Sequence, residues 1–127
     1  MKRHLLKTRN IFFIFSVLLF MTLFVFALRP LPKATSNNCI IHSGIVAKVE
    51  QGDGQGDIIV KLNENKNYFY INRGLDNGLL IEDLKEKLLH KKVDIYTIRH
   101  WTPLDPISRT KHIAKLTVDG VLIYSEM

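Results

Sequence analysis

The longest apolar segment of the chain is Ile11–Leu28, an uncharged run of 18 residues in which only Ser16 and Thr22 are polar. A helix of this length covers roughly 27 Å, close to the roughly 30 Å of a bilayer's hydrocarbon core. The pattern predicts a single transmembrane helix that anchors the chain in a membrane.

A second pattern begins at Ser43, where apolar and polar residues alternate as they do in a half-buried strand. Ile45, Ala47 and Val49 are expected on one face of the first strand. The loops Gly52–Asp57 and 63–67 contain the residues that turns favour, and they separate the first strand from strands over 58–62 and 68–71. We therefore expect three strands joined by hairpin-like turns.

The period then changes to that of a helix. Leu80, Leu84 and Leu88 are four residues apart, so residues 80–90 are predicted to form an amphipathic helix. On its polar face Asp83 and Lys87 are spaced to form an ion pair.

The rest of the chain predicts a strand over 93–99, an irregular segment from His100 to Thr110, and a final hairpin. Asp119-Gly120 is a preferred pair for a two-residue hairpin turn. The expected opposite pairs are Val118 with Val121, Leu116 with Ile123, Thr117 with Leu122 and Lys115 with Tyr124, with the first two pairs facing the core.

Over residues 43–125 the predicted order of elements is three strands, a helix and two or three further strands. This order resembles that of the oligonucleotide/oligosaccharide-binding (OB) fold, a five-stranded barrel. The predicted fold is an N-terminal transmembrane helix followed by a small, mainly-β, OB-like barrel. The expected parts are a cytoplasmic basic N-terminus (1–10), the transmembrane anchor (11–28), a linker (29–42) and an extracytoplasmic barrel domain (43–127).

Charge around the apolar run predicts its orientation. Four basic residues and no acidic ones precede it, whereas two basic residues follow it; the six are Lys2, Arg3, Lys7, Arg9, Arg29 and Lys33. Positive residues favour the cytoplasmic side of a membrane. We expect a single-pass protein of the cell inner membrane, with its N-terminus in the cytoplasm and its C-terminal domain outside.

A cleaved signal peptide, which would release a secreted binding module, is the alternative, because Val25-Phe26-Ala27 resembles a cleavage site. The retained anchor is preferred, since the apolar run exceeds the roughly 7 to 15 residues of a signal peptide's apolar region. Residues 29–32 contain two prolines, which would hinder the binding of this segment as an extended chain in the active site of a signal peptidase.

Residues 34–127 carry 12 basic and 12 acidic side chains. The excess of basic residues in the whole chain therefore lies on both sides of the anchor. The domain itself has no net positive charge, which nucleic-acid binding would require. Cys39 is the only cysteine, so a disulfide could form only between two copies, which would give a homodimer. A thiol without such a partner is the preferred interpretation.

Candidate site residues gather in the segment between the fourth strand and the final hairpin. This segment holds the only tryptophan together with imidazole, guanidinium and carboxylate groups, which could stack on a planar or sugar ligand and bind an anion. The candidate ligand- or partner-binding residues are Arg99, His100, Trp101, Asp105, Arg109 and His112. Packing of Trp101 into the barrel end is the alternative role for that side chain.

No catalytic or metal-binding motif of useful specificity follows the anchor, and no cofactor is expected. The loop Gly52–Asp57 is interpreted as a turn and not as a calcium site, because one copy lacks the other ligands such sites use. We expect a non-enzymatic, membrane-anchored small β-barrel that binds an envelope partner, either a protein or a glycan. The alternative is a small envelope enzyme or metal-binding protein that uses His100–His112, with His42 as a further zinc ligand.

Overall fold

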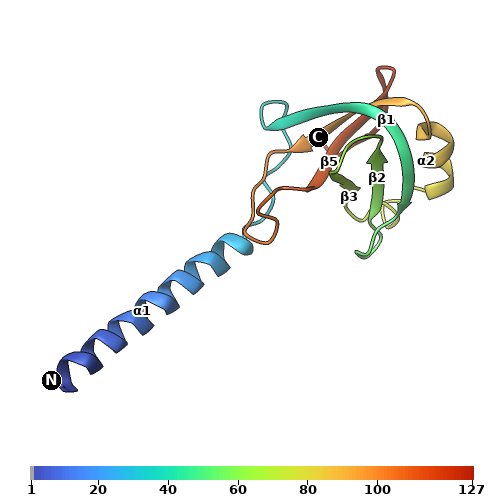
Figure 1. The fold of residues 1–127 in the computed structure, drawn as a ribbon. Helices are drawn as coiled ribbons and strands as arrows, with labels where there is room; N and C mark the ends of the chain where they lie inside the picture. The colour runs from blue at the N-terminus through green and yellow to red at the C-terminus, as the bar shows by residue number, and fades with distance from the viewer. Residues whose placement is uncertain (1) are drawn as a thin grey trace. The chain divides into compact units, whose positions relative to one another are not determined.

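The computed structural model describes residues 2–127, with the side chains from Thr8 onward. The chain forms two compact units, one that contains the N-terminal helix and one that contains the β-strands. Figure 1 shows the ribbon of the chain, with labels on the helices and on most of the strands.

Helix α1 (Lys2–Ala27) contains the predicted apolar run except for Leu28, its last residue. Its segment Thr8–Ala27 is long and apolar enough to cross a membrane, judged by length and composition. Large apolar side chains are exposed along it, including Phe12 and Phe20. The Thr22 hydroxyl donates a hydrogen bond of 2.8 Å to the Leu18 carbonyl oxygen, so this polar group is satisfied within the helix.

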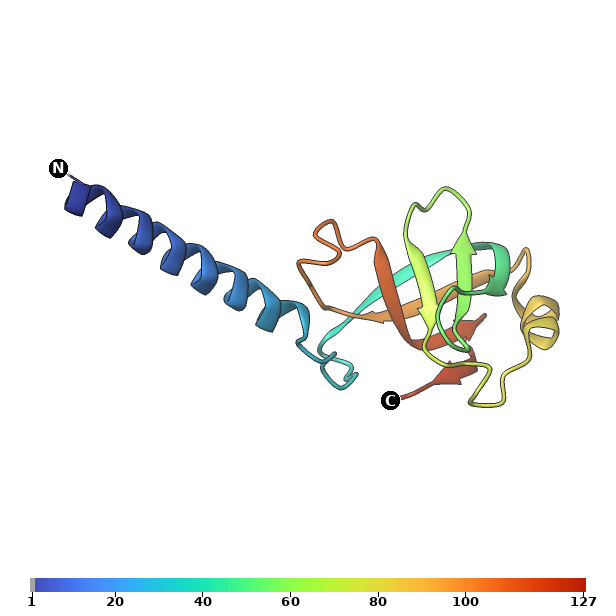
Figure 2. The same cartoon turned by 90° about the horizontal axis from the view of Figure 1, so that it is seen from below.

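The second unit is a closed five-stranded β-barrel with one additional strand. Strand β1 pairs with β2 and β4, β2 pairs with β3, β4 pairs with β5, and a parallel pairing of β3 with β5 closes the barrel. Figure 2 shows β5 beside β3 at this closure. The arrangement is compatible with an OB-like barrel. The elements are β1 (Cys39–Gln51), β2 (Ile58–Leu62), β3 (Tyr68–Ile71), α2 (Ile81–Leu88), β4 (Lys92–Ile98), β5 (Thr110–Val118) and β6 (Val121–Ser125).

Strand β1 is longer than expected, because it begins at Cys39 and takes in residues assigned to the linker. It bends across the barrel (Figure 1) and pairs with β4 along one part and with β2 along the other. The register with β2 shifts between Val46 and Lys48, as at a β-bulge, and this reverses the alternation of faces. Val46 and Val49 are therefore both buried, whereas Ile45 is 46% exposed. The prediction that Ile45 and Val49 share a face is wrong.

Helix α2 contributes Leu84 and Leu88 to the core, as the four-residue spacing predicts. Leu80 is 61% exposed and precedes the helix, so its assignment to the apolar face is wrong. The ion pair that the structure places on this helix joins Lys85 and Glu82 at 2.9 Å. The pair predicted between Asp83 and Lys87 does not appear among the ion pairs of the described residues.

The final hairpin turns at Asp119 and Gly120, whose φ angles of 49° and 79° are the positive values a type I′ turn needs. The predicted pairings Val118–Val121 and Thr117–Leu122 are confirmed. Val121 is exposed, so the prediction that it faces the core together with Val118 is wrong. A register shift between Leu116 and Thr117 changes the other two, so that Leu116 faces Tyr124 and Lys115 faces Ser125. The unpaired residue at this shift is Ile123 of β6. Leu116, Thr117 and Val118 of β5 are buried in succession.

Candidate functional site

A groove of about 600 Å³ lies on the outside of the barrel, where the β1–β2 loop meets β2 and β3. Its lining combines two phenol rings with carboxylate, amide and hydroxyl groups. The lining residues are Gly52, Asp53, Asp57, Ile59, Tyr68, Tyr70, Asn72 and Thr110.

Two tyrosines of β3 form the aromatic part of the groove. Strand residues alternate between faces, so Tyr68 and Tyr70 point outward while Phe69 between them is fully buried. Tyr68 is 47% exposed and Tyr70 is half-buried. Side chains two residues apart on a strand are roughly 6.6 Å apart along it, so both rings could contact one extended ligand.

The parallel pairing of β3 with β5 fixes the backbone beneath these rings. The Tyr68 amide donates a hydrogen bond of 2.8 Å to the Arg109 carbonyl oxygen. The Tyr70 ring stands edge-on to the His112 ring, with centroids 5.2 Å apart and an angle of 87°. Burial, with smaller contributions from Asp57 and Glu126, raises the pKa of Tyr70. The hydroxyl of a tyrosine can donate a hydrogen bond to a ligand.

The β1–β2 loop is a tight turn that forms the acidic end of the groove. The Gly52 amide donates to the Asp57 carbonyl oxygen at 2.8 Å, and the Arg73 amide donates to Asp57 Oδ1 at 2.8 Å. A Cβ atom on Gly54 would lie 2.2 Å from Asp57 Oδ2, so this close approach requires glycine. The Asp57 carboxylate is thereby held in place, and Asp53 is exposed beside it.

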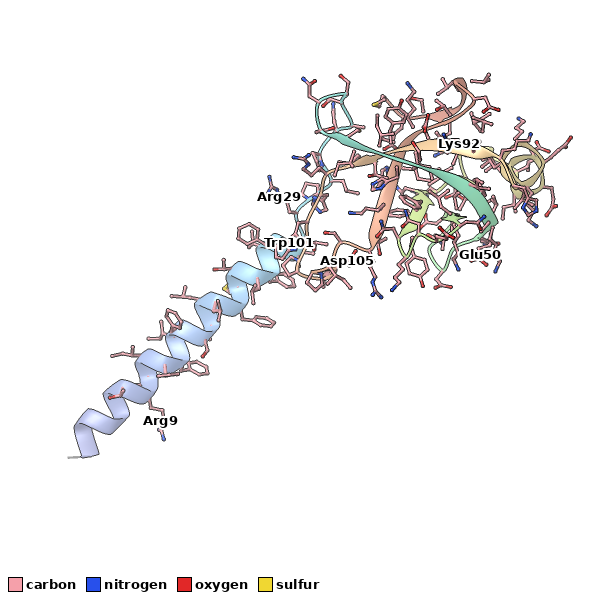
Figure 3. The ribbon with its side chains drawn as sticks, turned by 45° about the horizontal axis from the view of Figure 1, so that its top comes forward. Arg9, Arg29, Glu50, Lys92, Trp101 and Asp105 are labelled. Atoms are coloured by element: carbon pink, nitrogen blue, oxygen red, sulfur yellow. The ribbon has the colours of Figure 1, made fainter. Side chains whose placement is uncertain are left out.

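A smaller basic pocket of about 290 Å³ adjoins the groove and shares Tyr68 with it. The Lys61 Nζ atom lies 5.4 Å from the centroid of the Tyr68 ring and 2.8 Å from Glu50 Oε1. Figure 3 shows Glu50 on β1, next to the strands of this face. Hydrogen bonds from Lys48 and Lys61 lower the pKa of Glu50, and the pKa of Lys61 is raised in return. The pocket is lined by Lys61, Asn65, Lys66, Asn67, Tyr68 and Arg109.

His112 lies behind the groove in a cluster closed by the residues after β6. It is 7% exposed, and its Nε2 atom contacts the carboxylate of Glu126. Its Nδ1 atom is buried without a hydrogen-bond partner. The Tyr124 hydroxyl donates to Glu126 Oε2 at 3.3 Å, and burial, followed by the Glu126 charge, raises the pKa of Tyr124 to about 12.

The structure distributes the residues predicted from sequence over several places. Arg109 lines the basic pocket and His112 is buried behind the groove, whereas Asp105 belongs to the segment Thr102–Pro106, outside the compact unit of the barrel. Trp101 is 56% exposed. The two remaining candidates, Arg99 and His100, lie beyond the end of β4, are exposed and half-buried, and line neither the groove nor the basic pocket.

His42, suggested as a further zinc ligand, instead has its Nε2 atom 3.1 Å from the Thr97 hydroxyl and its ring 5.2 Å from that of Phe69. Burial lowers its pKa, and Lys111 adds to this effect. Over the part of the chain that the structure describes, no group of three or more His, Cys, Asp or Glu side chains is placed to hold a metal ion.

Sequence reasoning assigned Tyr68 and Tyr70 to a strand and did not identify them as site residues. The pattern Tyr68-Phe69-Tyr70 itself indicates two outward-facing aromatic side chains, because alternation along a strand places Phe69 inside the barrel and both tyrosines outside. Asn72 carries no such signal, since its place in the groove depends on pairing between distant strands. A comparison with protein-family models, curated proteins and solved structures finds no match to this chain.

Proposed function

We propose that this protein is a single-pass membrane protein that holds a non-enzymatic OB-like barrel outside the cytoplasm, where the groove over β2 and β3 binds a glycan. The groove lined by Tyr68 and Tyr70 carries the proposal. In OB folds this face of the barrel and the loop after β1 bind oligosaccharides and oligonucleotides.

The chemistry of the groove favours a sugar. Exposed phenol rings offer flat apolar faces, and the carboxylate, amide and hydroxyl groups of Asp53, Asn72 and Thr110 can bind sugar hydroxyls. An oligonucleotide would have to place phosphates beside Asp53 and Asp57, which repel them. Residues 34–127 carry equal numbers of acidic and basic side chains, which also disfavours nucleic acid.

The closed barrel argues against an extended peptide in the same groove. Strand β3 already pairs with β2 on one side and with β5 on the other. A peptide that adds a strand needs unpaired backbone groups at a sheet edge, and β3 offers few. Recognition in the groove therefore depends on side chains.

The membrane part of the proposal is supported by α1 and by the charges that flank it. Its segment Thr8–Ala27 has the length and composition of a membrane span, and the basic residues concentrate before it. Alkaline phosphatase fused after Met127 should be active in intact cells, and the mass of the mature protein should include the N-terminal segment. An expressed fusion without phosphatase activity would refute the orientation, since this enzyme needs disulfides that do not form in the cytosol. A mass that lacks residues 1–27 would show a cleaved signal.

The glycan proposal is testable with the four tyrosines of the chain. The full chain, labelled with 3-fluorotyrosine and placed in phosphatidylcholine nanodiscs, is titrated with N,N′-diacetylchitobiose and followed by ¹⁹F NMR. The resonances of Tyr68 and Tyr70 should shift, whereas those of Tyr96 and Tyr124, which lie outside the groove, should not. Tyr68→Ala should abolish the shift of Tyr70, and Tyr96→Ala is the matched control. Absence of any shift at millimolar sugar would refute the proposal.

A protein partner is the second candidate, favoured by one observation. Strand β6 lies at the end of the strand order and leaves Val121 and Leu122 64% and 57% exposed. Such an edge can accept a strand from another protein. Leu122→Lys should then abolish co-purification of a membrane partner from cells without changing the response of Tyr68 to the sugar.

The disulfide-linked homodimer through Cys39 stays a prediction. The thiol is half-buried, and its Sγ atom lies 3.8 Å from Asn38 Oδ1. Burial raises the pKa of Cys39, which lowers the fraction of reactive thiolate. Non-reducing electrophoresis of membranes, with Cys39→Ser as the control, tests this prediction. The enzymatic alternative relies on His100–His112, and of these residues His112 is buried against Glu126.

A further inference from the structure

Charge is unevenly distributed along the face that Tyr68 occupies. The groove on one side of this ring is lined by Asp53 and Asp57, and the basic pocket on the other side is lined by Lys61, Lys66 and Arg109. The two hollows share the Tyr68 ring, so a ligand that stacks on it could enter both. A ligand that fits would carry neutral hydroxyl groups at the acidic end and a negative group at the basic end.

Backbone and side-chain bonds hold the walls of the basic pocket in place. The Arg109 carbonyl oxygen accepts the Tyr68 amide hydrogen bond, which ties the start of β5 to β3. In the β2–β3 loop the Asn67 amide donates to Asn65 Oδ1 at 2.9 Å. Lys61 is positioned by Glu50, whose negative charge is shared with Lys48. The backbone segments that carry the cationic side chains are thus held in place before a ligand binds. Less conformational entropy of the protein is therefore lost on binding.

The pocket can accommodate one small anionic group. About 290 Å³ is large enough for a carboxylate-bearing substituent, and the amides of Asn65 and Asn67 add hydrogen-bond donors to the three cations. A guanidinium group matches the geometry of a carboxylate with two parallel hydrogen bonds.

We propose that the glycan bound by this protein is an acidic one, with a sugar ring on Tyr68 and Tyr70 and its carboxylate in the basic pocket beside Arg109 and Lys66. This inference rests on the proposed function, because it names the class of glycan for the same groove.

The test compares two disaccharides that differ by one lactyl group, which carries a carboxylate. The full chain in phosphatidylcholine nanodiscs is titrated with N,N′-diacetylchitobiose and with the disaccharide of N-acetylglucosamine and N-acetylmuramic acid, whose lactyl group supplies the carboxylate. The acidic disaccharide should bind about tenfold more tightly at 20 mM salt, and the difference should shrink at 0.5 M salt because the added interaction is ionic.

Variants assign the preference to the pocket. Lys66→Gln and Arg109→Gln should each reduce the preference for the acidic disaccharide severalfold and leave the affinity for the neutral one unchanged. Lys92→Gln, at an exposed lysine of β4 outside both hollows, is the matched control. Thermal unfolding of each variant verifies that it is folded.

The outcomes separate this inference from the function on which it rests. Equal affinity for both disaccharides, with ¹⁹F shifts at Tyr68, would overturn the acidic preference and leave glycan binding in place. No response to either disaccharide would overturn glycan binding itself. A poly-glutamate peptide that binds as tightly as the acidic disaccharide would show a site for anionic peptides and would overturn the inference.

Discussion

The imidazole of His112 contacts the carboxylate of Glu126, and this contact holds the segment after β6 against β5. The Glu126 amide reinforces it by donating to the Ala114 carbonyl oxygen at 2.9 Å. His112 pairs with Tyr70 across the parallel closure, so the segment covers the back of the groove.

Glu126→Gln should lower the free energy of unfolding by about 1 kcal/mol. The variant replaces the charged carboxylate that contacts His112 with a neutral amide, at a partly exposed site where charged hydrogen bonds contribute less than in the core. Chemical denaturation of the full chain measures the change. The matched control is Glu86→Gln on the exposed face of α2, which should alter stability by less than about 0.5 kcal/mol. Equal effects of the two variants would show that the contact contributes nothing.

Tyr124 should make the barrel sensitive to alkali. Its pKa is raised in the folded protein from its ordinary value near 10 to about 12. A group with a raised pKa favours the folded state below pH 10, and this contribution is lost as the pH rises from 10 to 12. Absorbance at 295 nm should show one phenol that ionises near pH 12, and Tyr124→Phe should remove it. Persistence of that ionisation in the variant would refute the assignment.

The two sides of β3 should respond differently to substitution. Phe69 is fully buried, so Phe69→Leu should cost about 1–2 kcal/mol of stability, because it leaves a void in the core. Tyr68→Ala, one residue away on the outer side, should cost less than about 1 kcal/mol while it removes sugar binding. The pair is measured by denaturation and by ¹⁹F titration. A larger loss of stability for Tyr68→Ala would contradict the outward direction of that ring.

The tight turn after β1 should be needed for the shape of the groove. Gly54→Ala would place a Cβ atom against Asp57 Oδ2, so the carboxylate must move away from the Arg73 amide. We expect a severalfold loss of affinity for the acidic disaccharide, with a modest fall in stability. Gln55→Ala, at the exposed neighbouring position, should leave the affinity unchanged. An unaltered affinity in Gly54→Ala would show that Asp57 does not contact the ligand.

Local patterns in the sequence predicted most of the barrel, because alternation and turn residues act over a few positions. Both errors in register have the same cause: one strand of a pair gains an unpaired residue, Ala47 of β1 opposite β2 and Ile123 of β6 opposite β5. Nothing in the local pattern marks these positions, since Ala47 and Ile123 both continue the apolar alternation of their strands.

The groove was less accessible to sequence reasoning than the fold. The distance between Asp53, Tyr68 and Thr110 depends on the pairing of three strands, whereas the candidate residues are neighbours in the sequence. Arg109 lies just before β5 and lines the basic pocket, and its ligand-binding role stays a prediction. The ligand-binding roles of Arg99, His100 and Trp101 stay predictions.

The closure of the barrel has a consequence for the order of events in a cell. β3 and β5 join through only three residue pairs, Tyr68–Thr110, Phe69–Lys111 and Tyr70–His112, and these partners are far apart in the sequence. Such a seam forms late, because a long loop must first be closed. A newly synthesised chain therefore has no finished groove until β5 has paired with β3, and a ligand of the groove can bind only after the barrel is assembled.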